Sequence, residues 1–484
     1  MRLLFLFGTL CFLVTAALGQ TSFIRTYGNT GYDYGRDIKE DNDTGYVVTG
    51  SSTSFGNDNT EAYLLKVDKN GEFQWSYNYG GSATEWGEAL VVTNDSTYAI
   101  AGYTNSYGAG GFDFYLVRIN EDGTPLWENY YGGSNWDRAY GMVQLPDSGF
   151  VLVGESYSFN EGLQHGYMVR TDKNGEVIWE ESITEDVPTF FSDIALDGDS
   201  IVVCGGIGDG GEDSYDGYYV KYHIDGTFGW SHQVGQEHND YFNAVYSVAG
   251  IYSFGGVRGY RFPEEKDNMW FYRTEDNGNL VIDTTYTTLA PENDGINDVI
   301  ARDFDQDYYY IGYTSSFGYM LDGKHDIFLG KMTLSGITVT NRNFGEAGED
   351  IGHAIDRSRD GGVVFLCDTR FFATGGHNIM IIKLNPYWEY PDMFADMVYD
   401  DITNSLPEYI ESSEFTVYPN PTEGLITLPE MHNGKYIIYG LDGKALMAGI
   451  IASDQIDVSS LSNGVYMLTV QTEEGIYSKR IIKN

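Results

Sequence analysis

The stretch DKNGEFQWSYNYGGSATEWGEALVVTNDSTYAIAG, residues 68–102, decides the fold of this chain. It contains an Asn-Gly turn, an aromatic strand around Trp75, a Tyr-Gly-Gly corner at residues 79–81 and two further strands that close on Gly102. The same order recurs about every fifty residues as far as residue 390, and Trp75, Trp127, Trp179 and Trp230 lie 52, 52 and 51 residues apart. A fixed period in this range indicates a repeat architecture, and here every unit consists of strands.

Each repeat contains four predicted strands, A to D, joined by hairpin turns. The C–D turn reads DKNG, NEDG, DKNG, HIDG and EDNG in successive repeats, and these turns place Asn or Asp before Gly because the backbone needs positive φ there. Seven A–B–C modules are present, with B strands expected to end at Gly50, Gly102, Gly154, Gly205, Gly255, Gly312 and Cys367.

The last module lacks a D strand, whereas one extra strand, SFIRTYG at residues 22–28, precedes the first module. If this strand completes the last sheet, the ring closes without an unpaired junction. We therefore predict an all-β protein in which residues 20–390 form a seven-bladed β-propeller closed by its N-terminal strand. This closure aligns Phe23 with Trp75, and Tyr27 with Tyr79.

Several residue types recur once per repeat. The recurring residues are the tryptophans named above; a basic residue late in strand C, at Lys66, Arg118, Arg170, Lys221, Arg273, Lys331 and Lys383; and an acid before strand A, at Asp33, Glu85, Asp137, Asp240, Asp294 and Asp350. A residue that every blade repeats is best explained by blade packing or by an ion pair between blades. The B–C loops, in contrast, differ from repeat to repeat, so we expect binding on the face that carries them.

Charge and the N-terminus bear on the compartment. The 484 residues include 28 basic and 71 acidic ones, and this net charge of -43 argues against nucleic acid or an anionic membrane as partner.

The first residues predict export. Arg2, an apolar run and a cleavage site at Ala17, Leu18 and Gly19 predict a signal peptide over residues 1–19. No later run resembles a membrane span of about twenty apolar residues. Cys204 and Cys367 lie in apolar strands, so we expect buried free thiols.

The composition changes after residue 390. Residues 391–414 contain seven acids and no Lys or Arg, which predicts a solvated acidic linker. Residues 415–484 alternate strands with Gly-Lys and Asn-Gly turns, which predicts a small C-terminal β-sandwich.

Two resemblances follow from these motifs. The C-terminal segment resembles the type A sorting domain of the type IX secretion system of Bacteroidota, through Tyr418, Pro419, Asn420, Pro421, Gly424, Gly443, Lys444, Leu461, Gly464, Val465, Tyr466, Lys479, Arg480 and Lys483. The repeats of residues 21–390 resemble secreted bacterial β-propeller repeats. These resemblances imply export via the periplasm by the type IX secretion machinery, to the outer-membrane surface or the medium. In the family the tail is usually removed, which here implies a cut near residues 411–415.

Motifs of catalysis are missing from the sequence. The eight histidines form no HExxH spacing, and neither a G-x-S-x-G nor a Walker motif occurs, so we assign no catalytic residue and predict no enzyme. No cofactor is expected, although Asp209, Glu212, Asp213 and Asp216 are candidates for calcium.

Three functions stay open at this stage. The first is a binding or interaction protein that presents its loop face to an extracellular glycan, protein or cation. The second is an enzyme, a hydrolase or lyase, that acts on extracellular polysaccharide through carboxylates of that face. The third is a structural surface-layer component. A central pocket with two asymmetric acids and stacked aromatic residues would favour the enzyme, whereas a shallow rim of repeated residues would favour binding.

Overall fold

The computed structural model of this protein divides into two compact units, one ending at Asn404 and the other beginning at Ser405. It describes residues 22–54, 59–159, 162–183, 186–208, 214–235, 238–261, 265–286, 293–302, 307–316, 324–345, 348–370, 376–388, 397–401, 417–429, 435–439, 445–451, 454–472 and 475–484. Every regular element in these ranges is a β-strand. The predicted signal peptide lies outside them and stays a prediction.

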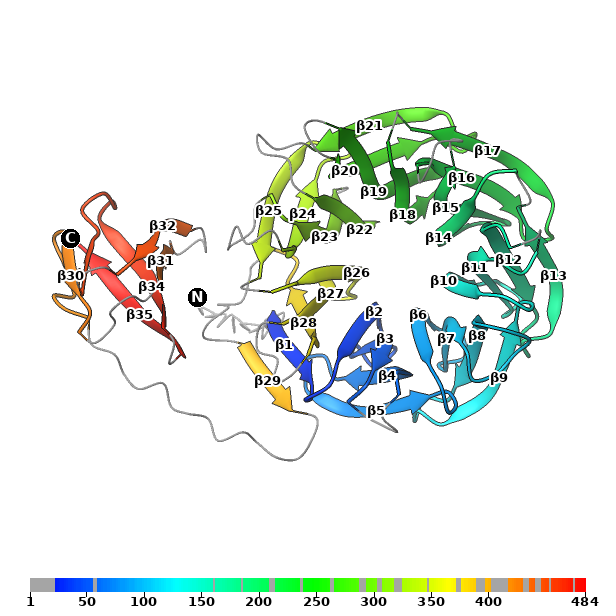
Figure 1. The fold of residues 1–484 in the computed structure, drawn as a ribbon, viewed down its shortest axis with the longest axis horizontal. Coiled ribbons are helices and arrows are strands. Elements are labelled where there is room, and N and C mark those ends of the chain that lie inside the picture. Colours follow the sequence, from blue (N-terminus) through cyan, green and yellow to red (C-terminus); the bar gives the residue numbers. More distant parts are fainter. Residues whose placement is uncertain are drawn as a thin grey trace, which may run out of the picture. The chain divides into compact units, whose positions relative to one another are not determined.

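The first unit is a β-propeller with seven blades in the described part of the chain, as predicted (Figure 1). The innermost strands of the blades are β2 (Asp33–Glu40), β6 (Glu85–Val92), β10 (Asp137–Gln144), β14 (Thr189–Asp197), β18 (Asp240–Val248), β22 (Asp294–Ala301) and β26 (Ile351–Arg357). Next in each sheet come β3 (Tyr46–Ser52), β7 (Tyr98–Thr104), β11 (Phe150–Ser156), β15 (Ser200–Gly208), β19 (Ile251–Arg261), β23 (Tyr308–Thr314) and β27 (Val363–Thr369).

The outer half of each blade follows in chain order. The third strands are β4 (Glu61–Val67), β8 (Asp113–Ile119), β12 (His165–Thr171), β16 (Tyr215–His223), β20 (Glu265–Thr274), β24 (Asp326–Met332) and β28 (Asn378–Leu384). The outermost strands of the first six blades are β5 (Phe73–Tyr79), β9 (Pro125–Tyr131), β13 (Val177–Ser182), β17 (Phe228–Val234), β21 (Leu280–Tyr286) and β25 (Thr338–Phe344).

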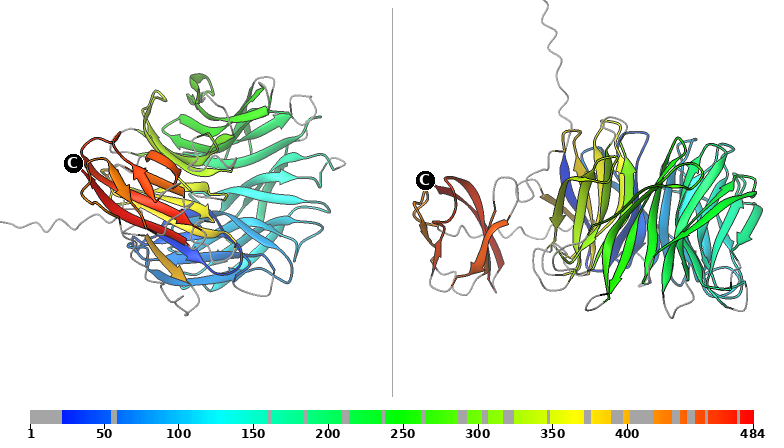
Figure 2. Two further views of the ribbon diagram at one scale, coloured as in Figure 1. Left: turned by 60° about the vertical axis from the view of Figure 1, so that its left-hand side comes forward. Right: turned by 90° about the horizontal axis from the view of Figure 1, so that it is seen from above.

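The two faces of the ring carry different connections. Figure 2 shows the blade strands running between the two faces. The D–A and B–C loops lie together on one face, which we call the loop face, because each A strand starts and each B strand ends there; Asp33, for example, pairs with Ser52. The tight A–B and C–D hairpin turns lie on the opposite face.

The N-terminal strand closes the ring as predicted. Strand β1 (Phe23–Gly28) pairs in antiparallel register with β28, with Phe23 opposite Lys383 and Tyr27 opposite Ile379. In the first blade, Trp75 lies opposite Lys66 in the same way, so Phe23 takes the tryptophan position of the seventh blade. The first and last repeats are thereby joined in one sheet.

A strand within the predicted linker departs from the sequence expectation. Strand β29 (Met397–Asp401) pairs in parallel with β1, with Ile24 opposite Met397 and Gly28 opposite Asp401. The seventh blade therefore has five strands. The outer edge of β1 presents unpaired backbone donors and acceptors, which pair with this segment despite its acidic surroundings in the sequence.

The glycine column follows from a close approach between the two inner strands. A Cβ on Gly102 would lie 1.8 Å from the carbonyl oxygen of Trp86, so only glycine fits at that position. In the fifth blade the prediction that Gly255 occupies this position is wrong. The equivalent residue is Gly256, where a Cβ would lie 2.1 Å from the carbonyl oxygen of Tyr241. The B strands also continue beyond these glycines to Ser52, Thr104 and equivalent residues.

Neighbouring blades are held together by apolar side chains and a repeated hydrogen bond. Val47 and Leu64 of the first blade pack with Ile100 and Tyr115 of the second in one buried cluster. The Tyr-Gly-Gly tyrosine crosses the same interface: Tyr79 donates to Gly123 O at 2.7 Å, and the equivalent bonds join Tyr27 to Gly71 O at 2.6 Å and Tyr131 to Gly175 O at 2.7 Å. Cys204 and Cys367 are buried and free, as predicted.

The second unit has its own apolar core. Strands β30 (Leu425–Thr427) and β33 (Gln455–Asp457) form a two-stranded sheet, and β32 (Ala445–Ile450), β31 (Lys435–Tyr439), β34 (Gly464–Thr472) and β35 (Gly475–Lys483) form a four-stranded one. Its buried cluster includes Ile426, Leu428, Ile438, Leu468 and Ile481.

Candidate functional site

A central channel runs between the innermost strands of the propeller. It has a volume of about 1090 Å³ and is lined by residues of the innermost strands of all seven blades. This volume is at the upper end of the range of small-molecule pockets, so the channel has room for a ligand larger than a typical metabolite.

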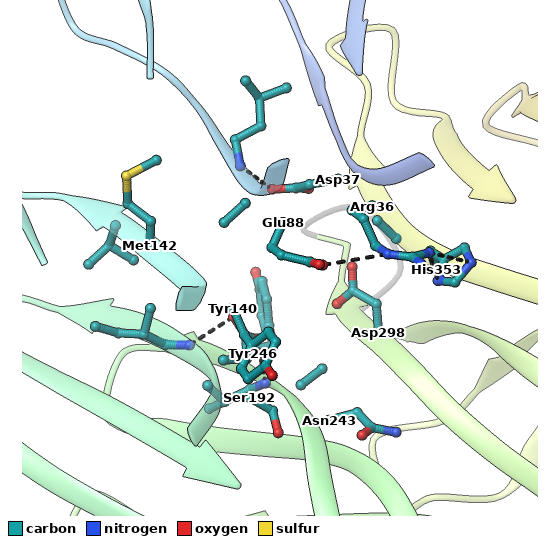
Figure 3. Close-up of a pocket in the computed structure, with 18 of the residues that line it drawn as sticks. Arg36, Asp37, Glu88, Tyr140, Met142, Ser192, Asn243, Tyr246, Asp298 and His353 are labelled. Carbon is teal, nitrogen blue, oxygen red and sulfur yellow. Dashed lines mark hydrogen bonds and ion pairs between the residues drawn. The ribbon is translucent and has the colours of Figure 1, made fainter. Parts of the chain in front are cut away.

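One residue of each innermost strand bulges out of its sheet and lines this channel. The bulge lies between Gly35 and Asp37 in β2, and the same irregularity recurs in the other six innermost strands. The bulged residues are Arg36, Glu88, Tyr140, Ser192, Asn243, Asn297 and His353, and all of them line the channel. A β-bulge re-aims a side chain locally. Because these residues differ in chemistry, the channel breaks the symmetry of the repeat, as Figure 3 shows.

Arg36 is the centre of a first charged network at the channel wall. Its Nη1 lies 3.2 Å from Asp368 Oδ2 and its Nε lies 3.5 Å from Glu88 Oε2. His353 Nε2 lies 2.7 Å from the same Asp368 oxygen. Burial raises the pKa of Glu88 to about 7, although Arg36 and a hydrogen bond from Tyr103 oppose the rise. Burial by itself would raise the pKa of Asp368, but His353 and Arg36 outweigh it and hold this pKa below its ordinary value.

A second network surrounds the buried carboxylate of Glu155. Tyr140 donates to Glu155 Oε1 at 2.8 Å, and Gln164 donates to Glu155 Oε2 at 2.5 Å. Tyr215 in turn donates to the Gln164 side-chain oxygen at 2.8 Å, and Arg138 Nη1 lies 3.4 Å from Glu155. The two networks therefore place two acids, Glu88 and Glu155, in different surroundings within one pocket.

Aromatic side chains form a row on the loop face beside the channel, where the guanidinium carbon of the channel residue Arg36 lies 5.5 Å from the Tyr34 ring and 5.3 Å from the Trp86 ring. This row, which we call the aromatic crescent, consists of Tyr32, Tyr34, Trp86, Tyr103, Phe112 and Trp136. Ring centroids lie 5.7 Å apart between Tyr34 and Trp86 and 6.2 Å apart between Trp86 and Tyr103, with both pairs stacked. Phe112 contacts Trp136 edge-on at 6.0 Å. The end members are open to solvent, with Tyr32 47% and Trp136 52% exposed.

Carboxylates below the bulge positions join neighbouring blades. Asp37 accepts from Leu90 N at 2.8 Å, Asp193 from Val245 N at 2.8 Å and Asp298 from Ile355 N at 2.9 Å. Each of these bonds reaches the innermost strand of another blade. Lys39 Nζ lies 2.6 Å from Asp37 and offsets part of this negative charge. We therefore assign these acids to the stability of the ring.

The basic column predicted from the sequence binds the A–B turns. Lys66 Nζ lies 2.7 Å from Asp43, Arg118 Nη2 2.6 Å from Asp95, Lys331 Nζ 2.8 Å from Asp307 and Lys383 Nζ 3.0 Å from Asp360. Arg170 pairs with Asp147 in the same way. These are pairs within one blade. The other two basic residues reach the next blade. Lys221 Nζ lies 2.5 Å from Asp276, and Arg273 donates to Leu334 O at 2.9 Å.

The tryptophan column lies against the next blade. Trp127 and Trp179 lie beside Gly175 and Gly226, the glycines of the next C–D turns, and Trp75 and Trp230 lie beside Gly123 and Gly278 in the same way. The indole nitrogen of Trp179 donates to Ile224 O at 3.1 Å, and that of Trp230 to Asp276 O at 3.1 Å. The structure thus gives both columns contacts within and between blades, away from the channel lining.

The acid column closes the D–A loops. Asp33 accepts from Ser54 Oγ at 2.7 Å and from Asn29 N at 3.0 Å, and Asp137 accepts from Gly133 N at 2.7 Å. Burial raises the pKa of Asp33. These acids hold the loops that form the channel mouth.

Part of the sorting motif lies in the described residues of the second unit. The Asn420 side chain bonds the final strand twice, donating to Arg480 O at 2.7 Å and accepting from Ile482 N at 2.8 Å. Tyr466 donates to Ser462 O at 2.6 Å, and Leu461 packs against the core. Gly424, whose carbonyl accepts from Val458 N at 2.7 Å, links β30 to the β33 region. Gly443 and Lys444 lie outside the described residues.

The calcium candidates fall mostly outside the described ranges. This applies to Asp209, Glu212 and Asp213, whereas Asp216 accepts from Gln233 Nε2 at 2.7 Å. Within the residues that the structure describes, no group of three or more His, Cys, Asp or Glu side chains is arranged to hold a metal ion.

The channel residues were missed by the sequence analysis, although the repeat contains a signal for them. In six blades the bulged residue lies three positions after the acid column, as Arg36 does after Asp33 and His353 after Asp350, and in the fourth blade Ser192 lies three positions after Thr189. This position changes its chemistry between repeats. A variable position at a fixed distance from a repeated acid is therefore the pattern that would have predicted the site.

Comparisons with known proteins support the division of the chain. Residues 416–484 match the model of the secretion system C-terminal sorting domain, and residues 94–125 match that of a β-propeller domain of unknown function, DUF5122. None of the curated proteins compared with this chain matches it.

Similar solved structures are propeller proteins of low identity. The WD40 domain of Pan2 from Neurospora crassa is 11% identical with a TM-score of 0.44, covering 73% of this chain and 90% of that one. PorZ, a surface component of the type IX secretion system of Porphyromonas gingivalis, is 10% identical with a TM-score of 0.40, covering 90% of this chain and 58% of that one. The β-propeller domain of the Trilobed protease from Pyrococcus furiosus is 12% identical with a TM-score of 0.42, covering 78% and 99%.

These findings define the class of protein. The chain is an exported β-propeller protein whose C-terminal sorting domain directs it through the type IX secretion system to the cell surface or the medium. No helix in the described ranges is long and apolar enough to cross a membrane.

Proposed function

We propose that this exported propeller binds an extracellular ligand at the loop-face mouth of its central channel. The observation that carries this proposal is the set of seven bulged residues, which are of six different types, with Asn in two neighbouring blades, and which line one cavity of about 1090 Å³. A concave site with a few convergent polar groups is the usual form of a ligand site. The repeated columns, in contrast, are accounted for by contacts within and between blades.

The acids of the channel favour binding over catalysis. Glu155 accepts from Tyr140 and Gln164 and lies beside Arg138, and Glu88 lies beside Arg36 and Tyr103. A general acid or base has to reach a proton of the substrate, whereas these carboxylates already serve as acceptors for groups of the protein. Their present geometry suits a rigid recognition surface.

A polysaccharide-active enzyme is the second candidate, and the criterion stated for it from the sequence supports it, since a central pocket, two acids in unequal surroundings and stacked aromatic residues are all present. It ranks second because both carboxylates already bond groups of the protein. The channel holds two acids in unequal surroundings, and burial raises the pKa of Glu88 to about 7, a value that suits a general acid at neutral pH. In this alternative Glu88 would protonate the leaving oxygen of a glycosidic bond. The appearance of new reducing ends, or of unsaturated ends from a lyase, after incubation of soluble polysaccharides with the protein and their absence with Glu88→Gln would establish it.

The proposal is tested by filling the channel. The chain from residue 20 onward is screened against glycan and protein arrays, alongside Ser192→Trp, which places a bulky ring in the channel, and Ser335→Trp in an exposed C–D turn as the control. We expect Ser192→Trp to lose the ligand that the unmodified chain and Ser335→Trp retain. Retention of every ligand by Ser192→Trp, with an unchanged circular dichroism spectrum, would exclude the channel as the binding site.

A further inference from the structure

The aromatic crescent identifies the chemical class of the ligand, on the premise that the channel mouth is the binding site. We infer that the mouth binds an uncharged glycan chain, which lies across the crescent and directs one end into the channel. This inference rests on three features of the described residues: the asymmetry of the aromatic side chains, the neutralised arginines and the mixed polar lining.

The crescent lies on the first three blades. At the position of Tyr34 and Trp86, the fourth and fifth blades also carry aromatic residues, Phe190 and Tyr241, whereas the third has Arg138 and the last two have Gly295 and Ile351. A function in the ring itself would require the same residue type in every blade. The aromatic surface is therefore uneven around the ring, and the crescent is the part of it that ends in the exposed side chains of Tyr32 and Trp136.

Trp136, at one end of the crescent, is fixed by its neighbours and still half-exposed. Trp136 touches Phe112 edge-on at 6.0 Å, and the guanidinium carbon of Arg138 lies 4.8 Å from its ring centroid. The loop residue Gly111 approaches so closely that a Cβ there would lie 2.1 Å from Trp136 Cδ1. The ring nevertheless stays 52% exposed. A fixed, half-exposed indole loses little conformational freedom when a ligand covers it.

The charges at the mouth select against anionic polymers. Arg36 is paired with Asp368 and Glu88, and Arg138 with Glu155, so both guanidinium charges are offset by carboxylates of the protein. The channel lining carries seven Asp and Glu side chains against Arg36, Lys39 and Arg357, and the net charge of -43 adds a general repulsion of anions. A polycation is therefore the competing ligand, which the test below includes. The chemistry that the crescent itself offers is stacking together with uncharged hydrogen bonds.

A pyranose chain fits this combination. Each sugar ring has a face of C–H groups, which stacks on an aromatic ring, and an edge of hydroxyl groups, which donate and accept hydrogen bonds. The channel lining adds polar atoms for these hydroxyl groups, among them the Ser192 hydroxyl and, as acceptors, the side-chain oxygens of Tyr140 and Asn243. Its volume of about 1090 Å³ leaves room for the end of a chain. Arg36 and Arg138 also stack on the crescent rings, 5.3 Å from Trp86 and 4.8 Å from Trp136, and so widen its flat surface.

The test compares removal of one ring with removal of a matched ring elsewhere. Trp136→Ala is compared with Tyr77→Ala, because Tyr77 is 47% exposed on the outermost strand β5, away from the mouth. The chain from residue 20 onward and both variants are titrated calorimetrically with soluble β-glucan, xylan and mannan. Polygalacturonate serves as the anionic glycan and a lysine-rich peptide as the charged polypeptide. We expect binding of at least one neutral glycan, about tenfold weaker in Trp136→Ala and unchanged in Tyr77→Ala.

The outcomes separate this inference from the proposal that it extends. Equal affinity of Trp136→Ala and the unmodified chain for the neutral glycan would overturn the role of the crescent. Binding of polygalacturonate or the peptide alone, abolished by Ser192→Trp, would overturn the glycan assignment and leave the channel as the binding site. Binding of none of these probes would also overturn the glycan assignment, while the array experiment with Ser192→Trp would still decide on the channel.

Discussion

Replacement of Glu88 by Gln removes a buried carboxyl group without changing its shape. The side chain is 13% exposed, lies 3.5 Å from Arg36 and has its pKa raised from 4.5 to about 7, chiefly by burial. The folded protein therefore holds this proton more tightly than the unfolded chain. The contribution of Glu88 to stability is complete below pH 4.5 and is lost as the pH rises through about 7.

The magnitude follows from the two pKa values. Between pH 5 and pH 8 the unmodified protein should lose about 2.5 kcal/mol of unfolding free energy through Glu88 alone. Glu88→Gln lacks this titration, so its stability relative to the unmodified protein should improve by about that amount across the same range. The Gln carbonyl oxygen can still accept the hydrogen bond of Tyr103, which limits other effects of the substitution.

Urea unfolding at pH 5 and pH 8 measures this difference directly. Glu121→Gln, at an exposed position in a C–D turn, is the control and should follow the unmodified protein at both pH values. If the stability difference between Glu88→Gln and the unmodified protein is the same at pH 5 and pH 8, burial does not raise the pKa of Glu88 and the description of the channel wall is wrong.

Two further predictions concern the ring. Deletion of residues 22–28 removes β1 from the outer edge of β28, which keeps only β27 as its partner. We therefore expect loss of the cooperative unfolding transition and of near-UV circular dichroism, with recovery when the SFIRTYG peptide is added, and a deleted chain that unfolds normally would contradict the closure. Tyr131→Phe leaves the buried carbonyl of Gly175 without the 2.7 Å bond, so it should lower the unfolding free energy by about 1–2 kcal/mol, whereas Tyr77→Phe on the exposed outer strand should change it by less than about 0.5 kcal/mol.

The sequence predicted the propeller well because its signals are local. Turn glycines, strand lengths and the Trp spacing repeat within single hairpins, and the leftover strand at residues 22–28 required a partner in the last blade. The β29 strand was not predictable in this way. It pairs with an edge formed by residues almost four hundred positions earlier, and its acidic surroundings indicate a linker.

The channel was harder to predict for a different physical reason. A bulge changes which face of a strand a residue occupies, so Arg36 and Glu88 line the channel although simple alternation gives no sign of it. The wrong assignment of Gly255 has another cause. Two adjacent glycines are compatible with the close contact, and only the position of the neighbouring strand decides between them. Export, in contrast, was predicted from short motifs at fixed spacing between Tyr418 and Lys483, which need no tertiary information to be recognised.

The five-stranded seventh blade also determines how the ring would respond to mechanical load. Phe23 lies opposite Lys383 in the antiparallel pair, so tension between the start of β1 and the end of β28 would peel that pair apart one hydrogen bond at a time. Strand β29 carries the chain to the far end of β1, where Gly28 lies opposite Asp401. Force applied through the two chain ends is then directed along the strands, and all the hydrogen bonds between β1 and β29 share it. A pull between the start of β1 and the end of β29 would therefore load the β1–β29 pair in shear and protect the closure of the ring.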